Sequence, residues 1–400
     1  MSQVLGEKLD ASPLWLESLS PWSLVVVLIA GICLRAWRWS QKRAPLLPER
    51  PRDQVDGDDV KGPAIAPLED FKWEETEPLQ FRPFRGRDRY NLTMAIENLD
   101  PSELIPMDKT YKDRLSLRKT LLEQHHDVVV AVNESATADK RIHDATRELY
   151  SFVLGTYLPN RYPSMFKLHH SPEDKCAVVE NAVTGAQWPS SLPAESPTIR
   201  ALEILALTVD EEFLILLPDA SCPPDQPKYI LQAYATCFPS GFNTREKLGL
   251  RLADIHGPVP GYADKLERSM DRFFARVEVG RYVKRVNWSV TTETELFAAF
   301  GSVHGSPTEG KEQAIRPGEL NLDETVLRCE RQTLHRMPQS KALVFAFHTY
   351  TYPIRQIKDE GFGEDLAVAI DGLKKGNVPA MHSYKRGDVW GDAVKDFLRS

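Results

Sequence analysis

The sequence predicts an α+β fold: an antiparallel sheet with flanking helices, preceded by one N-terminal transmembrane helix. Three observations support this prediction. Strand-like and helix-like runs are segregated along the chain and do not alternate, which is typical of α+β domains. No glycine-rich dinucleotide loop or phosphate-binding loop follows a strand. One uncharged apolar run stands near the N-terminus.

The composition is globular and excludes several classes of protein. The 400 residues are 42% hydrophobic and 27% charged, enough for a substantial core. A net charge of −7 without a long basic tract argues against nucleic-acid binding. The five cysteines are scattered and form no CxxC pair, which argues against a disulfide framework and against a thiolate zinc or iron–sulfur site.

Residues 18–34, "SLSPWSLVVVLIAGICL", carry the membrane prediction. The run has no charge, and its length is at the low end of the roughly 17–25 residues that cross a bilayer. Tryptophans stand near both of its ends as interfacial residues would, Trp15 and Trp22 on the N-terminal side and Trp37 and Trp39 on the C-terminal side. Basic residues follow it, which by the positive-inside rule places the rest of the chain in the cytosol: Arg35, Arg38, Lys42 and Arg43.

A cleaved signal peptide is the alternative for this segment, but it would start with basic residues, and here Glu7, Asp10 and Glu17 precede the run. Glycosylation triplets would matter only in a secretory lumen, and they arise often by chance: Asn91, Asn133 and Asn287. We therefore predict a single-pass membrane protein with its anchor in residues 1–39, in contact with the membrane over residues 18–39, and a cytosolic domain.

Residues 40–80 predict an extended linker, because prolines alternate there with charged residues and few large apolar side chains are available to bury. The globular domain is expected over residues 81–400. Apolar spacing predicts helices over residues 108–125 and 136–158, the second ended by Pro159 and Pro163.

The middle and end of the chain supply the predicted sheet. Apolar, β-branched and aromatic runs predict strands over residues 213–218, 229–239, 282–290, 325–334 and 342–352. Shorter helices are expected after the second strand and at the end of the chain, over residues 243–255, 262–277, 364–373 and 388–398.

His256 in "LADIHGPVP" is the first candidate for chemistry. A histidine at a helix end can simply cap the last carbonyls. Here Gly257 permits a sharp exit, and Pro258 and Pro260 stiffen it. A fixed imidazole beside an apolar wall is what a planar cofactor with one axial ligand requires.

Two strands supply the remaining candidates. In "VLRCERQTLHRMP", Glu330 and Gln332 share one strand face with Arg328, and in "KRVNWSV", Arg285 shares a face with Asn287. An ordinary amphipathic strand with a solvated polar face is the alternative. If this face is buried, its charges must be paired with opposite charges or must serve in binding or catalysis.

These stretches together resemble a known family. "CFPSGFNTREKLGLRLADIHGPVPGY", "RVNWSV" and "LRCERQTLHRMPQSKALVFAFHTY", with the upstream "PFRGRDRYNLTMAIENLDPSELIPMDKTYKDRLSLRKTLL", resemble the alpha subunit of haem-dependent oxidative N-demethylase. The resemblance covers roughly residue 81 to the C-terminus. It implies a PAS-like haem-binding domain and a reaction that removes a methyl group from a small secondary or methylated amine, with O2, as formaldehyde.

The resemblance also implies roles for particular residues and partners. His256 would be the axial ligand of haem b iron, and the catalytic set would be Glu330 for the substrate ammonium, Arg285 for dioxygen and Gln332 as a supporting contact. Electrons would come from NADPH through a flavin and iron–sulfur reductase on a separate polypeptide. Other histidines remain possible ligands: His169, His170, His335 and His348.

Two other functions stay open. A non-catalytic haem sensor or carrier would need the imidazole and the pocket shape but no buried anion, so Glu330 favours the enzyme. A relative that has lost haem and serves as a scaffold is the third reading, and the joint presence of His256, Arg285 and Glu330 counts against it.

Overall fold

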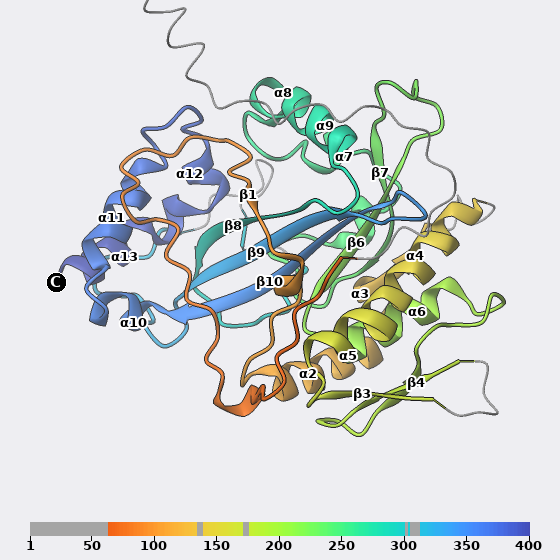
Figure 1. Cartoon of the computed structure of the whole chain (residues 1–400). Coiled ribbons are helices and arrows are strands. Elements are labelled where there is room, and N and C mark those ends of the chain that lie inside the picture. The colour runs from red at the N-terminus through yellow and green to blue at the C-terminus, as the bar shows by residue number, and fades with distance from the viewer. Residues whose placement is uncertain (1–62, 134–138, 171–175, 301–302, 305–312) are drawn as a thin grey trace, which may run out of the picture. The chain divides into compact units, whose positions relative to one another are not determined.

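The computed structural model of the chain describes residues 63–133, 139–170, 176–300, 303–304 and 313–400 (Figure 1). All of them fall in one unit, Val60–Ser400. Part of the predicted linker is described, and Ile65, Leu68, Phe71 and Trp73 pack against the core.

A seven-stranded antiparallel sheet forms the centre of this unit, in the order β1-β8-β9-β10-β6-β7-β2. Its strands are β1 Glu97–Asn98, β2 Val130–Val132, β6 Glu212–Pro218, β7 Tyr229–Ala235, β8 Tyr282–Thr291, β9 Val326–Arg336 and β10 Leu343–Pro353. The five strands expected from the sequence are β6 to β10, so the predicted α+β fold with an antiparallel sheet is confirmed. A smaller sheet pairs β3 Phe166–His169, β4 Val178–Asn181 and β5 Gln187–Pro189.

Helices cover both faces of the large sheet. On one face lie α2 Tyr111–Gln124, α3 His126–Val129, α4 Lys140–Phe152, α5 Leu158–Arg161 and α6 Thr198–Thr208 (Figure 1). The other face meets α7 Leu252–Ile255, α8 Tyr262–Lys265 and α9 Glu267–Arg276. The C-terminal helices pack with this second core: α10 Ile354–Asp359, α11 Gly363–Gly372, α12 Met381–Tyr384 and α13 Gly387–Arg399.

Strand alternation explains the two cores. Along β6, Phe213 and Ile215 point to the α2, α4 and α6 side, whereas Leu214 and Leu216 point to the α7 to α9 side. Each face therefore buries its own set of apolar side chains, at roughly 1.5–3 kcal/mol for a fully buried large one. Residues next to each other in a strand consequently lie in different chemical environments.

The helix expected over residues 136–158 runs further than predicted. After α4 the chain forms a π-helical turn, Val153–Tyr157, and continues through α5 to Arg161. Pro159 does not end the helix, because it occupies the first turn of α5, where a missing backbone N–H costs little.

The prediction of a transmembrane helix has to be corrected. Among the residues that the structure describes, no helix is long and apolar enough to cross a bilayer. The prediction rested on residues 18–34 alone, a run at the lower length limit for a span, and the anchor assigned to residues 1–39 lies outside the described residues. The transmembrane helix, and the single-pass topology with a cytosolic domain inferred from it, therefore find no support in the residues that the structure describes.

Candidate functional site

A cavity of about 270 Å³ lies between the large sheet and helices α7 to α9. The sheet contributes side chains from β6, β8, β9 and β10, and residues 90–96 and α12 complete the wall. Most of the lining is apolar, as in cofactor pockets, where a few polar groups set the orientation. The polar and charged lining side chains include Tyr90, Lys247, His256, Arg285, Asn287, His304, Glu330, Gln332, Tyr384 and Lys385.

His256 lines this cavity from the C-cap of α7. Its Nδ1 lies 2.8 Å from the carbonyl oxygen of Leu252, and because a carbonyl only accepts, Nδ1 carries the proton. The ring stacks on Tyr262, with centroids 4.6 Å apart and planes 11° apart. Burial lowers the pKa of His256 to about 4, so the ring is neutral at neutral pH and Nε2 keeps its lone pair.

The strand register brings Arg285, Gln332 and Glu330 together. In the β8–β9 ladder Arg285 stands opposite Gln332, and Asn287 stands opposite Glu330. The Arg285 Nε donates to the Gln332 amide oxygen at 2.7 Å, and the Gln332 Nε2 donates to Glu330 Oε2 at 2.8 Å. The guanidinium and the carboxylate are therefore joined through the glutamine and do not pair directly.

One oxygen of Glu330 has no partner. Glu330 is 6% exposed, and its Oε1 is buried without a hydrogen bond among the described residues. Its Oε2 accepts from Gln332 and, at 3.5 Å, from Asn287 Nδ2. An unpaired buried carboxylate oxygen costs free energy unless a ligand satisfies it, so this atom indicates a binding position for a cation or hydrogen-bond donor.

Lys385 extends the polar chain at its other end. Its Nζ donates to Asn287 Oδ1 at 3.2 Å and to the carbonyl oxygen of Trp288. Burial lowers its pKa to about 8, partly offset by the attraction of Glu330. This lysine lies in the two-residue connection between α12 and α13 and was missed in the sequence, where nothing distinguishes it from a surface lysine.

Two further basic groups in the cavity were also missed. His304 stacks on Tyr384 with centroids 4.6 Å apart, and burial lowers its pKa to about 3. Lys247 donates to the carbonyl oxygen of Ile255 at 3.2 Å, and burial lowers its pKa. Within the described part of the chain, the cavity lining thus carries several basic side chains and one carboxylate, Glu330.

None of the four alternative histidines lines the cavity. His169 is exposed, and its Nε2 lies 2.7 Å from Glu180 Oε2. His170 is also exposed. His335 and His348 are buried on the opposite face of the sheet, among α2, α4 and α6. Of the histidines named from the sequence, only His256 can therefore reach a ligand in the cavity.

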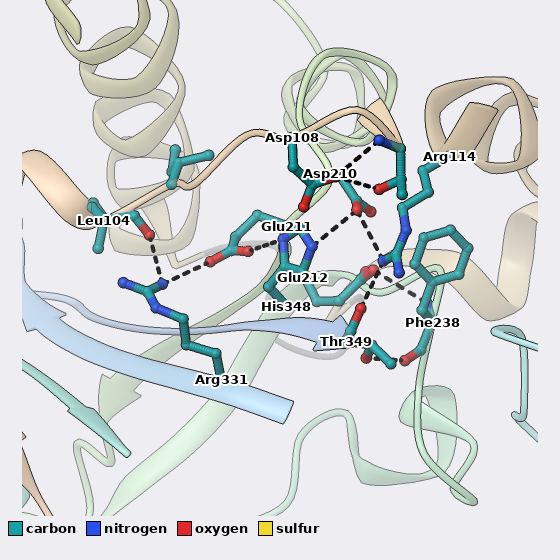
Figure 2. Close-up of polar contacts among 12 residues, drawn as sticks. Leu104, Asp108, Arg114, Asp210, Glu211, Glu212, Phe238, Arg331, His348 and Thr349 are labelled. Carbon is teal, nitrogen blue, oxygen red and sulfur yellow. Dashed lines mark hydrogen bonds and ion pairs between the residues drawn. The ribbon is translucent and has the colours of Figure 1, made fainter. Parts of the chain in front are cut away.

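His348 belongs to a buried charge network, shown in Figure 2. Its ring nitrogens lie 3.2 Å from carboxylate oxygens of Asp210 and Glu211, in contacts without hydrogen-bond geometry. Arg114 Nη1 donates to Asp210 at 3.0 Å. Arg331 Nη1 lies 3.9 Å from Glu211 and donates to the carbonyl oxygen of Leu104 at 3.2 Å.

The same network continues to Arg118, which is fully buried. Its Nη1 pairs with Glu212, and its Nε donates to the carbonyl oxygen of Ala206 at 2.8 Å. Burial raises the pKa of Glu212, and the guanidinium of Arg118 opposes that shift. Each carboxylate here has a cation within about 4 Å, so the network ties α2 to β6 and neutralises its buried charges. The two oxygens of Glu211 have no hydrogen bond among the described residues, and their charge is balanced by Arg331 at 3.9 Å.

A family model described as haem-dependent oxidative N-demethylase, alpha subunit-like, matches residues 95–395. This range contains the cavity-lining strands and helices, and the match confirms the resemblance drawn from the sequence motifs. The description is that of an oxidoreductase that depends on haem. Among the described residues, no three His, Cys, Asp or Glu side chains gather into a metal site of their own.

Proposed function

The chain belongs to the haem-dependent oxidative N-demethylase alpha subunit-like family, and from this premise we propose that it is a haem enzyme that removes a methyl group from a small amine with O2. The observation that supports the proposal is that two atoms without a hydrogen-bond partner among the described residues belong to side chains of the same cavity. His256 offers a neutral imidazole nitrogen, and Glu330 offers a buried carboxylate oxygen.

The residues fit a haem with one protein ligand. A metal-binding imidazole usually donates its other N–H to a backbone carbonyl or carboxylate, and the Nδ1 contact of His256 with Leu252 has this form. The depressed pKa keeps the ring in the unprotonated form that binds iron. Apolar side chains such as Leu214, Phe345 and Phe347 line the cavity, as the porphyrin faces require.

The haem, when bound, supplies the oxygen chemistry, and the protein supplies binding and electrostatics. Glu330 holds the ammonium of the substrate through Oε1, an ion pair that is strong in a site shielded from water. Arg285 places a fixed positive charge where negative charge develops as O2 is reduced. Gln332 sets the distance between these two groups, because it donates to one and accepts from the other.

The overall reaction consumes an O2 molecule, a pair of electrons and a pair of protons, and yields the demethylated amine, formaldehyde and water. Lys385, with its pKa near 8, can release and regain a proton close to neutral pH. The electrons would come from NADPH through a separate flavin and iron–sulfur reductase. The word "subunit" in the family description supports such a partner.

The first test is an absorption spectrum of the purified full chain reconstituted with haem. A specific Soret band is expected, and His256→Ala should abolish or greatly weaken it, whereas the control His169→Ala, remote from the cavity, should leave it intact. Absence of the band in the wild type would refute the haem-based proposal.

A second test separates the enzyme from a haem sensor or carrier. Small methylamines should perturb the ferric spectrum of the wild type, and Glu330→Gln should weaken the response about tenfold or more, because an amide cannot form the ion pair. Glu180→Gln, on the smaller sheet, is the matched control. A wild-type spectrum that ignores amines while retaining the Soret band would favour the sensor.

A further inference from the structure

A second hollow, of about 830 Å³, lies beside the edge of the large sheet. In the part of the chain that the structure describes, most of the backbone of β8 is unpaired at this edge. β1 pairs only with Val283 and Lys284 of β8, so the remainder of β8 has no partner strand on this side among the described residues. The N-terminal segment passes beside β8, as Figure 1 shows in orange, and residues 79–97 form much of the opposite wall.

This hollow is strongly basic in a protein whose net charge is −7. Among the residues that the structure describes, two carboxylates line it, Glu97 and Glu103. The cationic lining residues are Arg82, Arg87, Arg89, Arg161, Lys284, Arg285 and Arg331. A concave surface that gathers one sign of charge concentrates counter-ions of the opposite sign.

Arg87 and Arg89 are the two cations that remain free. Neither has an ion-pair or hydrogen-bond partner for its guanidinium among the described residues, and Asp88, between them in sequence, is not part of the lining. The others are engaged elsewhere: Arg82 with Glu360, Arg161 with Ala66, Lys284 with Glu103, Arg285 with Gln332 and Arg331 with Glu211.

The backbone that carries these two arginines is held closely by α11 and the loop that follows it. Tyr90 N donates to the carbonyl oxygen of Gly372 at 3.0 Å. A Cβ on Gly372 would come within 3.0 Å of the Asp88 carbonyl, and a Cβ on Gly376 would come within 1.4 Å of the Tyr90 carbonyl oxygen. Only glycine permits this approach, so the free arginines project from a backbone that is fixed in place.

The basic hollow and the cavity share a wall. Tyr90, Thr93, Lys284, Arg285 and Asn287 line both of them. The side chain of Asn287 also contacts Glu330 at 3.5 Å. A fixed carboxylate thus stands on one side of this wall and two unpaired guanidinium groups on the other.

We propose that the basic hollow binds the anionic tail of the substrate, which makes the substrate a methylated amine that carries a carboxylate or a phosphate. This inference rests on the proposed function. The ammonium end would bind Glu330 and the anionic end would bind Arg87 and Arg89, whose planar guanidinium groups suit both kinds of oxyanion. The size and concavity of the hollow match a small-molecule pocket of roughly 300–1,000 Å³ and not a flat protein-docking surface.

The experiment compares two amines of similar shape on the full-length, haem-reconstituted protein by calorimetry: 4-(methylamino)butanoate and N-methylbutylamine. The wild type should bind the first at least about tenfold more tightly, as expected for charge-assisted hydrogen bonds. The double variant Arg87→Gln, Arg89→Gln should lose that preference and keep its affinity for N-methylbutylamine. The control Arg268→Gln, Arg276→Gln removes two exposed arginines of α9 outside both hollows and should keep the preference.

Inorganic phosphate, added as a competitor of each amine, tests whether the hollow has a position for an oxyanion. Competition by phosphate against 4-(methylamino)butanoate, but not against N-methylbutylamine, supports a shared anion position. Equal binding of the two amines by the wild type, or a preference that survives in the double variant, overturns the inference. The proposed function fails separately: a missing Soret band with the tail preference intact would refute the haem chemistry alone, and a Soret band without the preference would refute this inference alone.

Discussion

His335 offers a stability test that is independent of any ligand. It lies in β9 on the sheet face opposite the cavity, is 1% exposed, and has no hydrogen-bond partner at either ring nitrogen. Its ring stacks on Tyr282 with centroids 4.8 Å apart, and Phe152 lies near it. The change His335→Phe keeps a flat ring in this place and removes both nitrogen atoms.

The expected magnitude follows from the pKa of His335, which burial lowers from 6.5 to about 3. Below pH 6.5 His335 binds a proton in the unfolded chain, whereas in the folded protein it stays neutral until the pH falls to about 3. The free energy of unfolding therefore falls with pH across this window, by roughly 1.4 kcal/mol per pH unit. Two pH units below 6.5, the loss amounts to roughly 3 kcal/mol.

The phenylalanine variant cannot lose stability in this way. The difference in free energy of unfolding, variant minus wild type, should therefore rise by roughly 3 kcal/mol between pH 7.5 and pH 4.5. His256 and His304, whose pKa values are also lowered by burial, are present in both proteins and cancel in the difference.

Urea unfolding followed by tryptophan fluorescence at several pH values measures this difference. His169→Phe is the matched control, since His169 is an exposed histidine paired with Glu180, and its replacement should not produce the same rise towards low pH. Parallel stability curves for the wild type and His335→Phe would refute the assignment of a neutral, unsatisfied imidazole at this position.

Three further predictions test the site, the glycine contact and the charge network. Gln332→Leu removes the link between the guanidinium and the carboxylate in the cavity and should weaken amine binding about tenfold in the ferric-spectrum titration; unchanged binding would contradict the positioning role. Gly376→Ala forces a methyl group against the Tyr90 carbonyl and should lower the free energy of unfolding by roughly 2 kcal/mol or more, seen as a lower melting temperature. Arg118→Met leaves the carboxylate of Glu212 buried without its cation and should cost about 3–5 kcal/mol in urea unfolding, whereas a loss below about 1 kcal/mol would show that the pair is not essential.

The large sheet was predictable because its strands carry long, regular signals. β8, β9 and β10 each run for ten residues or more, and β6 and β7 are rich in aliphatic and aromatic side chains. The smaller sheet was missed because β3, β4 and β5 are only three or four residues long, too short for alternation to be read. α6 was missed because most of its residues are buried, so it has no polar stripe to reveal its period.

The site was predictable only in part, and for a similar reason. Alternation along one strand placed Glu330 and Gln332 on a common face, and both side chains line the cavity in the structure. The cross-strand partner of each, and the contribution of Lys385 and His304, depend on register and on segments distant in sequence. Single residues in short turns carry no pattern, so no sequence signal identified them.

The charges before β6 show the same limit more clearly. Asp210, Glu211 and Glu212 precede an apolar run and look like the polar boundary of a strand. All three are buried, because cations far away in sequence reach them: Arg114 and Arg118 from α2 pair with Asp210 and Glu212, and Arg331 from β9 lies near Glu211. Burial of a charge can be inferred only when its partner is known, and the sequence does not specify the partner.

Buried carboxylates on the two faces of the sheet therefore differ in whether a cation of the protein lies beside them, and this contrast bears on function. Against α2, the carboxylates of Asp210, Glu211 and Glu212 each have a cation within about 4 Å, even though the oxygens of Glu211 accept no hydrogen bond among the described residues. In the cavity, Glu330 forms no ion pair among the described residues and leaves one oxygen unsatisfied. A buried carboxylate that lacks a protein partner lowers stability. Its persistence beside the free imidazole nitrogen of His256 is therefore best explained by a cationic ligand that completes it.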